Sequence, residues 1–364
     1  MHIMNYLFTV PRRAAALLLA AFALCGGAAR AEPDVLERPA IPSVKAAGSV
    51  LLAITTAGTG RRLVAAGERG IILWSDDRGL GWHQASVPVS VSLTALRFIN
   101  GQDGWALGHS GILLRTRDGG KNWSKQLDGK QAAALMLAAV KADSRSGRQA
   151  LADAERLVAE GANKPWLDLH FFDARHGLLV GAFGLLFATD DGGQSWQAAP
   201  GRIDNPKAKH LYAVAGHGDA CLIAGEQGAL YYSDNRGQSF SAADAGYQGS
   251  YFGGLALSPR ALLAFGMRGN VRWSDDAGAS WHRSDLGTTA SISAGLRLRD
   301  GALLLADDTG QLYRSTDGGK RFDHIAPPQP SPFTAIAQAD DGSLLLAGVR
   351  GITRIALNPA KVQP

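Results

Sequence analysis

Short apolar runs alternate with turns rich in Gly, Asp and Ser along most of this chain. One stretch shows the pattern clearly and predicts strands over 93–99, 105–108, 111–116 and 123–127. Four runs of this length, bounded by Gly and Asp turns, are typical of one blade of a β-propeller. Because these segments lack a 3.6-residue period, a helical solenoid is excluded.

The unit recurs at a fixed interval. Each copy begins with a Gly-x-x-Gly motif, in which Asp replaces the first glycine once, and a short apolar run follows. The copies begin at Gly67, Gly108, Gly181, Gly225, Gly266, Asp307 and Gly348. Their spacings are 41, 73, 44, 41, 41 and 41 residues, so one interval carries an insertion of about 32. Seven similar units predict an all-β, seven-bladed β-propeller.

Six of the seven units also carry a second motif, Ser/Thr-x-Asp-x-Gly-x-x-Trp/Phe, known as the Asp-box. Its acidic or amide position is occupied by Asp77, Asp118, Asp191, Asn235, Asp276 and Asp317. The carboxylate and the hydroxyl can accept backbone N–H groups within a tight turn, and the glycine tolerates positive φ. A motif needed by every unit predicts a structural hairpin, which we favour over catalytic aspartates or calcium sites.

The seventh unit lacks this hairpin and has three predicted strands. We expect the fourth to come from residues 35–45, completing the last blade. Pro39 and Pro42 would be tolerated there, because an outermost strand has one unpaired edge.

The insertion, about residues 129–163, lies between the second and third units and is rich in Ala, Leu, Arg and Glu. Apolar residues such as Ala134, Leu137, Ala154 and Leu157 fall at helical spacing, and residues 143–147 interrupt them. We therefore predict a helical hairpin. It either packs against the rim or docks a partner.

Residues 1–31 resemble a cleavable secretory signal, with Arg12 and Arg13, an apolar run and Ala29-Arg30-Ala31. Residues 32–364 would then form a single propeller in the periplasm. Removing the three arginines of the leader reduces the net charge from +5 to +2, which argues against nucleic acid as a partner. Cys221 would remain as a single thiol in an apolar strand, so no disulfide is expected.

Strand direction places the Gly-x-x-Gly turns and the helical insertion on one face and the Asp-boxes on the other. The variable residues between the glycines would form a ring around the channel mouth, either as a recognition surface or as ordinary solvated loop tips. The candidates for contact with a partner are Glu68, Arg69, His109, Phe183, Glu226, Met267, Arg268 and Arg350.

The repeated Asp-box, the Gly-x-x-Gly ring and segments such as 164–168 and 180–184 resemble the photosystem II stability/assembly factor family, in its broad bacterial branch. The resemblance covers essentially the whole mature chain. It implies a seven-bladed propeller, exported to a lumen or periplasm, that binds membrane-protein subunits during assembly without catalysing a reaction.

The alternatives are a sialidase-like glycoside hydrolase and a carbohydrate-binding propeller, because sialidases share the Asp-box. Residues 37–42 only partly resemble the sialidase Arg-Ile-Pro motif, and Tyr231 and Tyr251 have no obvious acidic partner by spacing. The sequence alone does not exclude a pair of carboxylates at the separation that glycoside hydrolysis requires. No catalytic residue, metal site or cofactor is predicted. We expect a monomeric, non-enzymatic scaffold for a membrane or envelope protein.

Overall fold

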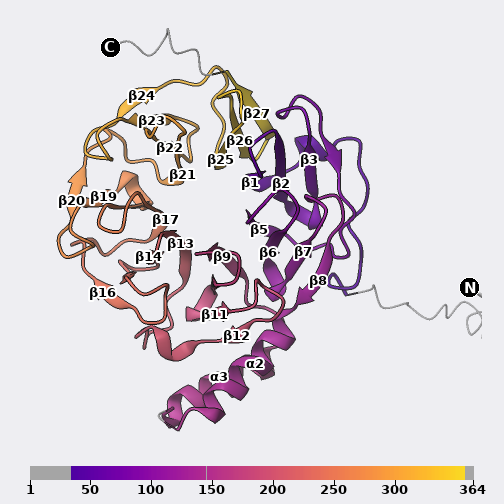
Figure 1. Cartoon of the computed structure of the whole chain (residues 1–364), viewed down its shortest axis with the longest axis vertical. Helices are drawn as coiled ribbons and strands as arrows, with labels where there is room; N and C mark the ends of the chain where they lie inside the picture. Colours follow the sequence, from indigo (N-terminus) through magenta and orange to yellow (C-terminus); the bar gives the residue numbers. More distant parts are fainter. Residues whose placement is uncertain (1–33, 145, 357–364) are drawn as a thin grey trace, which may run out of the picture. The chain divides into compact units, whose positions relative to one another are not determined.

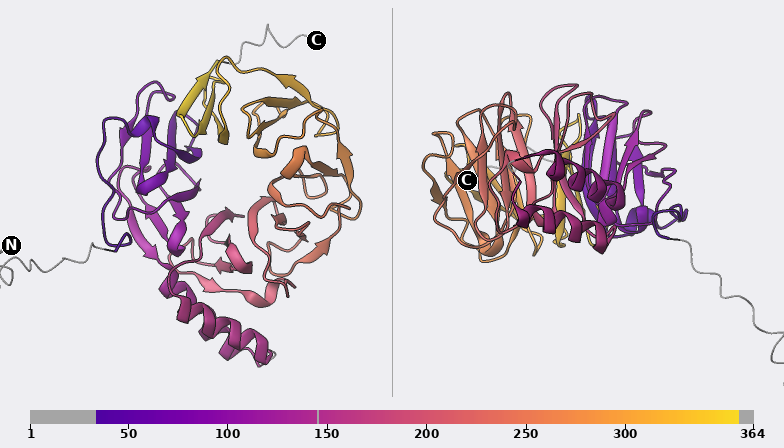
Figure 2. Two further views of the ribbon diagram at one scale, coloured as in Figure 1. Left: turned by 180° about the vertical axis from the view of Figure 1, so that it is seen from behind. Right: turned by 90° about the horizontal axis from the view of Figure 1, so that it is seen from below.

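The computed structural model describes residues 34–144 and 146–356, and its compact propeller unit begins at Val35. The predicted leader, residues 1–31, lies outside the described residues. Six four-stranded antiparallel sheets and one three-stranded sheet form a ring, which confirms the predicted seven-bladed propeller (Figure 1). Seen from the side, the ring is a disc with a helical hairpin at its rim (Figure 2).

Within each sheet, successive strands run from the central channel outward. The first sheet contains β1 (Leu51–Ala57), β2 (Arg62–Gly67), β3 (Ile72–Ser75) and β4 (His83–Gln84). The second contains β5 (Leu93–Phe98), β6 (Gly104–Gly108), β7 (Leu113–Thr116) and β8 (Ser124–Leu127). The third contains β9 (Trp166–Phe171), β10 (Gly177–Gly181), β11 (Leu186–Thr189) and β12 (Gln197–Ala198). The predicted strands of the second unit match these bounds to within two residues.

The remaining sheets repeat this order. The fourth contains β13 (Leu211–His217), β14 (Ala220–Gly225), β15 (Leu230–Ser233) and β16 (Ser241–Ala243). The fifth contains β17 (Tyr251–Ala256), β18 (Leu262–Gly266), β19 (Val271–Ser274) and β20 (His282–Ser284). The sixth contains β21 (Ile292–Arg297), β22 (Leu303–Asp307), β23 (Leu312–Ser315) and β24 (Asp323–Ile325). The last has three strands, β25 (Phe333–Gln338), β26 (Leu344–Gly348) and β27 (Gly351–Ile355).

The hydrophobic core lies between neighbouring blades. Strands such as β6, β10 and β14 are buried along their whole length because both faces of their sheet are covered. The described residues form seven apolar clusters, one at each junction between adjacent blades. Each blade is therefore stabilised by its two neighbours, as in other repeat architectures.

Among residues 34–144 and 146–356 the last sheet has no fourth strand, so the prediction that residues 35–45 complete the last blade is wrong. This segment forms no strand and runs beside the connection between the first two blades. The Ser90 amide donates to the Val35 carbonyl at 2.9 Å, and the Ala40 amide donates to the Val87 carbonyl at 3.0 Å. The amide of Ser43 donates to the Gln84 side chain at 2.8 Å. These partners hold the segment away from the last sheet.

The last and first blades meet through side chains and a common core. The Thr334 hydroxyl donates to the Leu51 carbonyl at 2.7 Å, and Arg78 pairs with Asp340. A short 3-10 turn, η1 (Ala46–Gly48), supplies Ala46 to the apolar cluster at this junction. This junction is therefore built like the other six, with an added turn from the N-terminal segment.

The insertion forms the predicted helical hairpin, α2 (Gly129–Ala142) and α3 (Arg148–Glu160). Asp128 begins α2 with a capping box, because its carboxylate accepts from the Gln131 amide at 3.0 Å while the Gln131 side chain accepts from the Asp128 amide at 3.0 Å. Met136 and Val140 bury one face of α2 against the third blade. Among the described residues, no helix is long and apolar enough to cross a membrane.

Candidate partner-binding face

The Gly-x-x-Gly motif forms the tight turn between the second and third strands of each blade. Its second variable residue adopts the left-handed conformation in five blades, with φ from 51° to 58°. The second glycine cannot carry a side chain. A Cβ at Gly70 would lie 2.1 Å from the Val89 carbonyl oxygen, and one at Gly351 would lie 2.0 Å from the Ala47 carbonyl oxygen. The turn therefore keeps its glycine while the tip residues vary.

The helical hairpin begins beside one of these turns. A Cβ at Gly111 would lie 2.4 Å from the Cα atom of Gly129, the first residue of α2. The insertion and the ring of variable tips therefore share one face of the disc, as the sequence predicts. We call this the tip face.

Three acidic tip residues accept hydrogen bonds from backbone amides of their own blade. The Glu68 carboxylate accepts from the Val50 amide, the Glu226 carboxylate from the His210 amide and the Asp308 carboxylate from the Ser291 amide, each at 3.1 Å. These amides stand at or just before the innermost strand of each blade. Glu68 and Glu226 thus have a structural role that sequence analysis missed.

The cationic tips are unengaged. The side chains of Arg69, Arg268 and Arg350 are exposed and make no hydrogen bond or ion pair with any described residue. Exposed apolar residues lie on the same turns, namely Phe183, Met267 and Val349. His109 is also exposed at its tip. This face therefore offers free guanidinium groups beside apolar surface, with three of its carboxylates already engaged.

The six Asp-boxes serve the fold. The carboxylate of Asp191 accepts from the Thr189 hydroxyl at 2.8 Å and from the amides of Gln194 and Ser195 at 2.9 and 3.0 Å. Burial alone would raise the pKa of Asp191, but the hydrogen bond from the Ser195 hydroxyl at 2.6 Å, together with these bonds, lowers it to about 2. Asn235 makes the matching bond to Ser233 at 2.8 Å. Equivalent bonds are formed by Asp77, Asp118, Asp276 and Asp317. The structural interpretation of the motif accounts for every copy.

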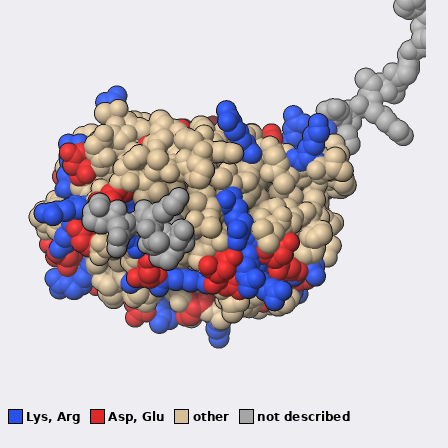
Figure 3. All heavy atoms as spheres, turned by 90° about the horizontal axis from the view of Figure 1, so that it is seen from above, with Lys and Arg blue, Asp and Glu red and all other residues tan. Residues whose placement is uncertain are grey.

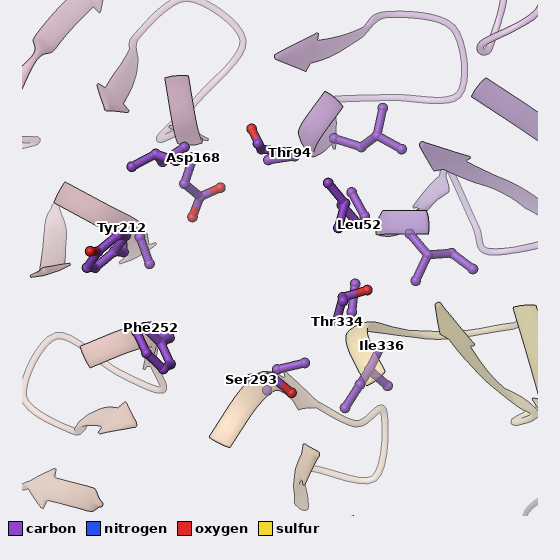
Figure 4. Close-up of a pocket in the computed structure, with 18 of the residues that line it drawn as sticks. Leu52, Thr94, Asp168, Tyr212, Phe252, Ser293, Thr334 and Ile336 are labelled. Carbon is purple, nitrogen blue, oxygen red and sulfur yellow. The ribbon is translucent and has the colours of Figure 1, made fainter. Parts of the chain in front are cut away.

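The central channel is lined by the innermost strand of each blade (Figure 4). Several polar side chains on these strands connect neighbouring blades. The Thr94 hydroxyl donates to the Trp166 carbonyl at 2.8 Å, and the Ser293 hydroxyl donates to the Phe333 carbonyl at 2.6 Å. The channel wall is thus held by hydrogen bonds between blades.

Asp168 is the one carboxylate among the described residues that line the channel. One oxygen pairs with Arg97 Nη2 at 2.9 Å, and the other accepts from the Val214 amide at 3.1 Å. Burial raises the pKa of Asp168, and burial lowers the pKa of neighbouring His170 to about 4. Glycoside hydrolysis uses a pair of carboxyl groups, whereas this lining supplies one that already links three blades.

The structure places no thiol, metal-ligand cluster or single-sign charged surface where the described residues could form a further site. Cys221 is buried, which raises the pKa of its thiol to about 12. Among the described residues, no cluster of three or more His, Cys, Asp or Glu side chains gathers in a way that could hold a metal ion. Acidic and basic side chains are intermixed on the rim shown in Figure 3, so that rim presents no single-sign surface for a nucleic acid.

Comparison with known proteins identifies a family. Residues 50–147 and 151–324 match the family described as photosynthesis system II assembly factor YCF48. A photosystem II assembly lipoprotein Ycf48 from Synechococcus sp. (strain CC9902) is 30% identical over 95 residues, which is 23% of this chain and 28% of that protein. The chain therefore aligns with less than a third of that relative's length.

Solved structures share the fold at low sequence identity. A structure of YCF48 bound to D1 peptide superposes with a TM-score of 0.61 at 16% identity, covering 85% of this chain and 94% of that one. YCF48 from Cyanidioschyzon merolae gives 0.60 at 16% identity, covering 86% and 97%. The WD40 propeller domain of Doa1 gives 0.61 at 7% identity, covering 89% and 97%, so the fold extends beyond the family. Because the family match covers most of its length, this chain belongs to the photosynthesis system II assembly factor YCF48 family.

Proposed function

We propose that this protein is a non-enzymatic scaffold that binds a membrane or envelope protein through its tip face and assists the assembly or stability of that partner. The observation that carries the proposal is the division of charge on this face. Glu68, Glu226 and Asp308 are engaged by backbone amides, whereas Arg69, Arg268 and Arg350 are free. Free guanidinium groups beside exposed apolar tips suit a protein segment that carries carboxylates.

Two further lines support the proposal. One structural relative is described as bound to D1 peptide, which is a precedent for a propeller of this family binding a segment of another protein. The described residues that line the channel include one carboxylate, that of Asp168, and it links neighbouring blades. We place the protein in the periplasm, exported by the secretory signal in residues 1–31 and acting as a monomer. A related protein is named a lipoprotein, which agrees with export.

The test is capture of partners from detergent-solubilised membranes of the source cells. The variant changes Arg69, Arg268 and Arg350 to Glu, and we expect it to lose partners that the unmodified protein retains. A matched control changes three exposed arginines away from the tip face to Glu, namely Arg117 and Arg321 in Asp-box hairpins and Arg283 in β20. Equal recovery by all three proteins would exclude the tip face as the binding surface.

A panel of fluorogenic glycosides separates this proposal from the hydrolase alternative. We expect no turnover of any glycoside above the background of the buffer. Turnover that disappears in the triple arginine variant would overturn the scaffold proposal in favour of a sialidase-like enzyme.

A further inference from the structure

The fifth blade carries buried polar atoms that have no partner. Among the described residues, seven buried side-chain atoms lack a hydrogen-bond partner, and three of them are the Tyr251 hydroxyl, Asn270 Oδ1 and Arg272 Nε. Tyr251 is 0% exposed and Asn270 is 7% exposed. A buried polar group without a partner destabilises the folded protein, so native structures satisfy such groups with protein atoms, water or a ligand.

The sheet of this blade brings the three side chains to one face. Tyr251 of β17 pairs with Gly266 of β18, whose amide donates to the Asn270 carbonyl at 3.0 Å. Val271 packs against the sixth blade, so Asn270 and Arg272 on either side of it point towards the fourth blade, where Tyr251 also packs. Burial raises the pKa of Tyr251 to about 12, and the Arg272 guanidinium opposes that rise, which places the two groups close together.

Other blades fill the equivalent positions with apolar side chains. In the first blade these are Leu51, Ile71 and Leu73, which belong to one apolar cluster. In the third blade, Trp166 and Phe187 occupy the first and last of the three positions, and their ring centres lie 5.0 Å apart. Side chains at these positions therefore contact one another, and in the fifth blade all three are polar.

The sixth blade also has polar residues at this place, and there they satisfy one another. His324 Nε2 lies 2.8 Å from Gln311 Oε1. The Tyr313 hydroxyl donates to the Asp307 carboxylate at 2.9 Å. Polar side chains at these positions can thus be partnered within a blade, which does not happen in the fifth.

Two cations stand together at the same junction. Arg283 of β20 lies directly opposite Arg272 on the same face of the sheet, an arrangement in which like charges repel. Neither guanidinium forms an ion pair with any described residue. The nearby acids Asp244 and Asp285 each accept a backbone amide of their own turn, at 2.8 and 3.0 Å. Because Arg272 is only partly exposed, an anion beside it would be attracted more strongly than in water.

We propose that Tyr251, Asn270 and Arg272 bind a small tetrahedral oxyanion, phosphate or sulfate, at the junction of the fourth and fifth blades. Arg272 would donate from its guanidinium and Tyr251 from its hydroxyl, and the Asn270 amide can turn to present its NH2 group. Arg283 adds a second cation from the outermost strand. Donors that come from several strands suit a tetrahedral anion better than a planar carboxylate. A free anion is favoured over a side chain of another protein because Tyr251 and Asn270 are buried.

The test measures the thermal unfolding of the purified protein and its binding of phosphate. Unfolding is followed in the potassium salts of phosphate, sulfate and acetate, each against chloride at equal ionic strength, and equilibrium dialysis counts bound radiolabelled phosphate. Arg272→Leu introduces the residue that the first blade has at this position, and Tyr251→Phe removes the hydroxyl alone. Arg117→Leu is the matched control, because Arg117 is an exposed arginine in the Asp-box hairpin of the second blade.

We expect phosphate and sulfate to raise the unfolding temperature by about 2 to 4 °C at ten times the dissociation constant. Dialysis should find about one phosphate per chain. Arg272→Leu should abolish the shift and weaken phosphate binding at least about ten-fold, Tyr251→Phe should weaken it less, and Arg117→Leu should change neither. In chloride, Arg272→Leu should unfold at the same temperature as the unmodified protein or a higher one, because it removes an unpaired cation. Lost binding would then not result from misfolding.

Equal unfolding temperatures in phosphate, sulfate and chloride, with no phosphate retained in dialysis, would overturn the inference and leave the three polar atoms to bound water. A phosphate shift that persists in Arg272→Leu would overturn it as well, by placing the anion elsewhere. Stabilisation by acetate alone would contradict a tetrahedral anion and assign the site to a carboxylate. The inference does not rest on the proposed function, and because the assay contains no partner protein, the two can fail separately.

Discussion

The ion pair between Arg97 and Asp168 predicts that removing Arg97 alone lowers the free energy of unfolding. Arg97 Nη2 pairs with the carboxylate at 2.9 Å, and its Nε donates to the Leu169 carbonyl at 3.1 Å. The Arg97 side chain is 44% exposed in the channel, whereas that of Asp168 is 9% exposed. Replacing Arg97 by Met leaves a buried carboxylate without its cation.

The magnitude follows from this geometry. Breaking a buried ion pair by removing one partner costs about 3 to 5 kcal/mol. Because Arg97 is partly solvated, and because two backbone amides continue to donate to Asp168, we expect the lower end of that range. The Arg97→Met protein should lose about 3 kcal/mol of unfolding free energy at pH 7.

The loss should depend on pH in a defined direction. Burial raises the pKa of Asp168, and removal of Arg97 raises it further because the guanidinium favours the carboxylate form. An acid whose pKa is raised by folding binds its proton more tightly in the folded state, so its penalty applies above the folded pKa and fades as pH falls towards the unfolded value. The deficit of Arg97→Met should therefore shrink as pH falls from 7 towards the unfolded value of about 4.

Urea unfolding followed by tryptophan fluorescence measures both effects. The control is Arg297→Met, since Arg297 also lies on an innermost strand and its Nη1 donates to the Leu257 carbonyl at 2.9 Å without an ion pair. We expect that control to cost at most about 1 kcal/mol. A deficit for Arg97→Met no larger than that of the control, or one that grows as pH falls, would refute the reasoning.

Three further predictions test the scaffold. Asp118→Ala should cost about 1 to 2 kcal/mol in urea unfolding because it removes the acceptor for Thr116, Lys121 and Asn122; the same loss in Asp234→Ala, whose exposed carboxylate makes no bond with any described residue, would contradict it. The pKa values of Asp173, Asp191 and Asp276 are lowered to about 2, so the stability they contribute is present above about pH 4 and is lost as pH falls to 2; acid titration of the fluorescence checks this, and an unchanged unfolding midpoint over that interval would count against it. The Cys221 thiol, with its pKa raised to about 12, should react with a thiol reagent at pH 8 only in urea; rapid labelling of the native protein would show the strand to be accessible.

The fold was predictable because its requirements are local. Gly70 must lack a Cβ, and Asp191 must accept the amides of its own turn, so each repeat records its geometry in a few adjacent positions. The alternation of turns and runs then determines the number of blades. The helical hairpin was predictable for the same reason, since its apolar spacing and its interruption lie within one short segment.

The missing strand and the roles of the tips were not predictable in this way. The absence of an Asp-box from the seventh unit shows that a strand is missing without showing that another segment replaces it. Residues 35–45 are held instead by Val87, Gln84 and Ser90, partners more than 40 residues away. Likewise, the inward turn of the Glu68 and Glu226 carboxylates depends on where the amides of Val50 and His210 point.

The junction between the last and first blades has a consequence for chain connectivity. Among the described residues this seam consists of packed side chains with the Thr334 hydroxyl across it, and no strand is exchanged there. Closure of the disc therefore does not depend on which junction between blades is left open. Circular permutants opened between any two blades should assemble the same closed disc. Rearranged genes of this kind would leave the ring of tips unchanged while moving both termini around its circumference.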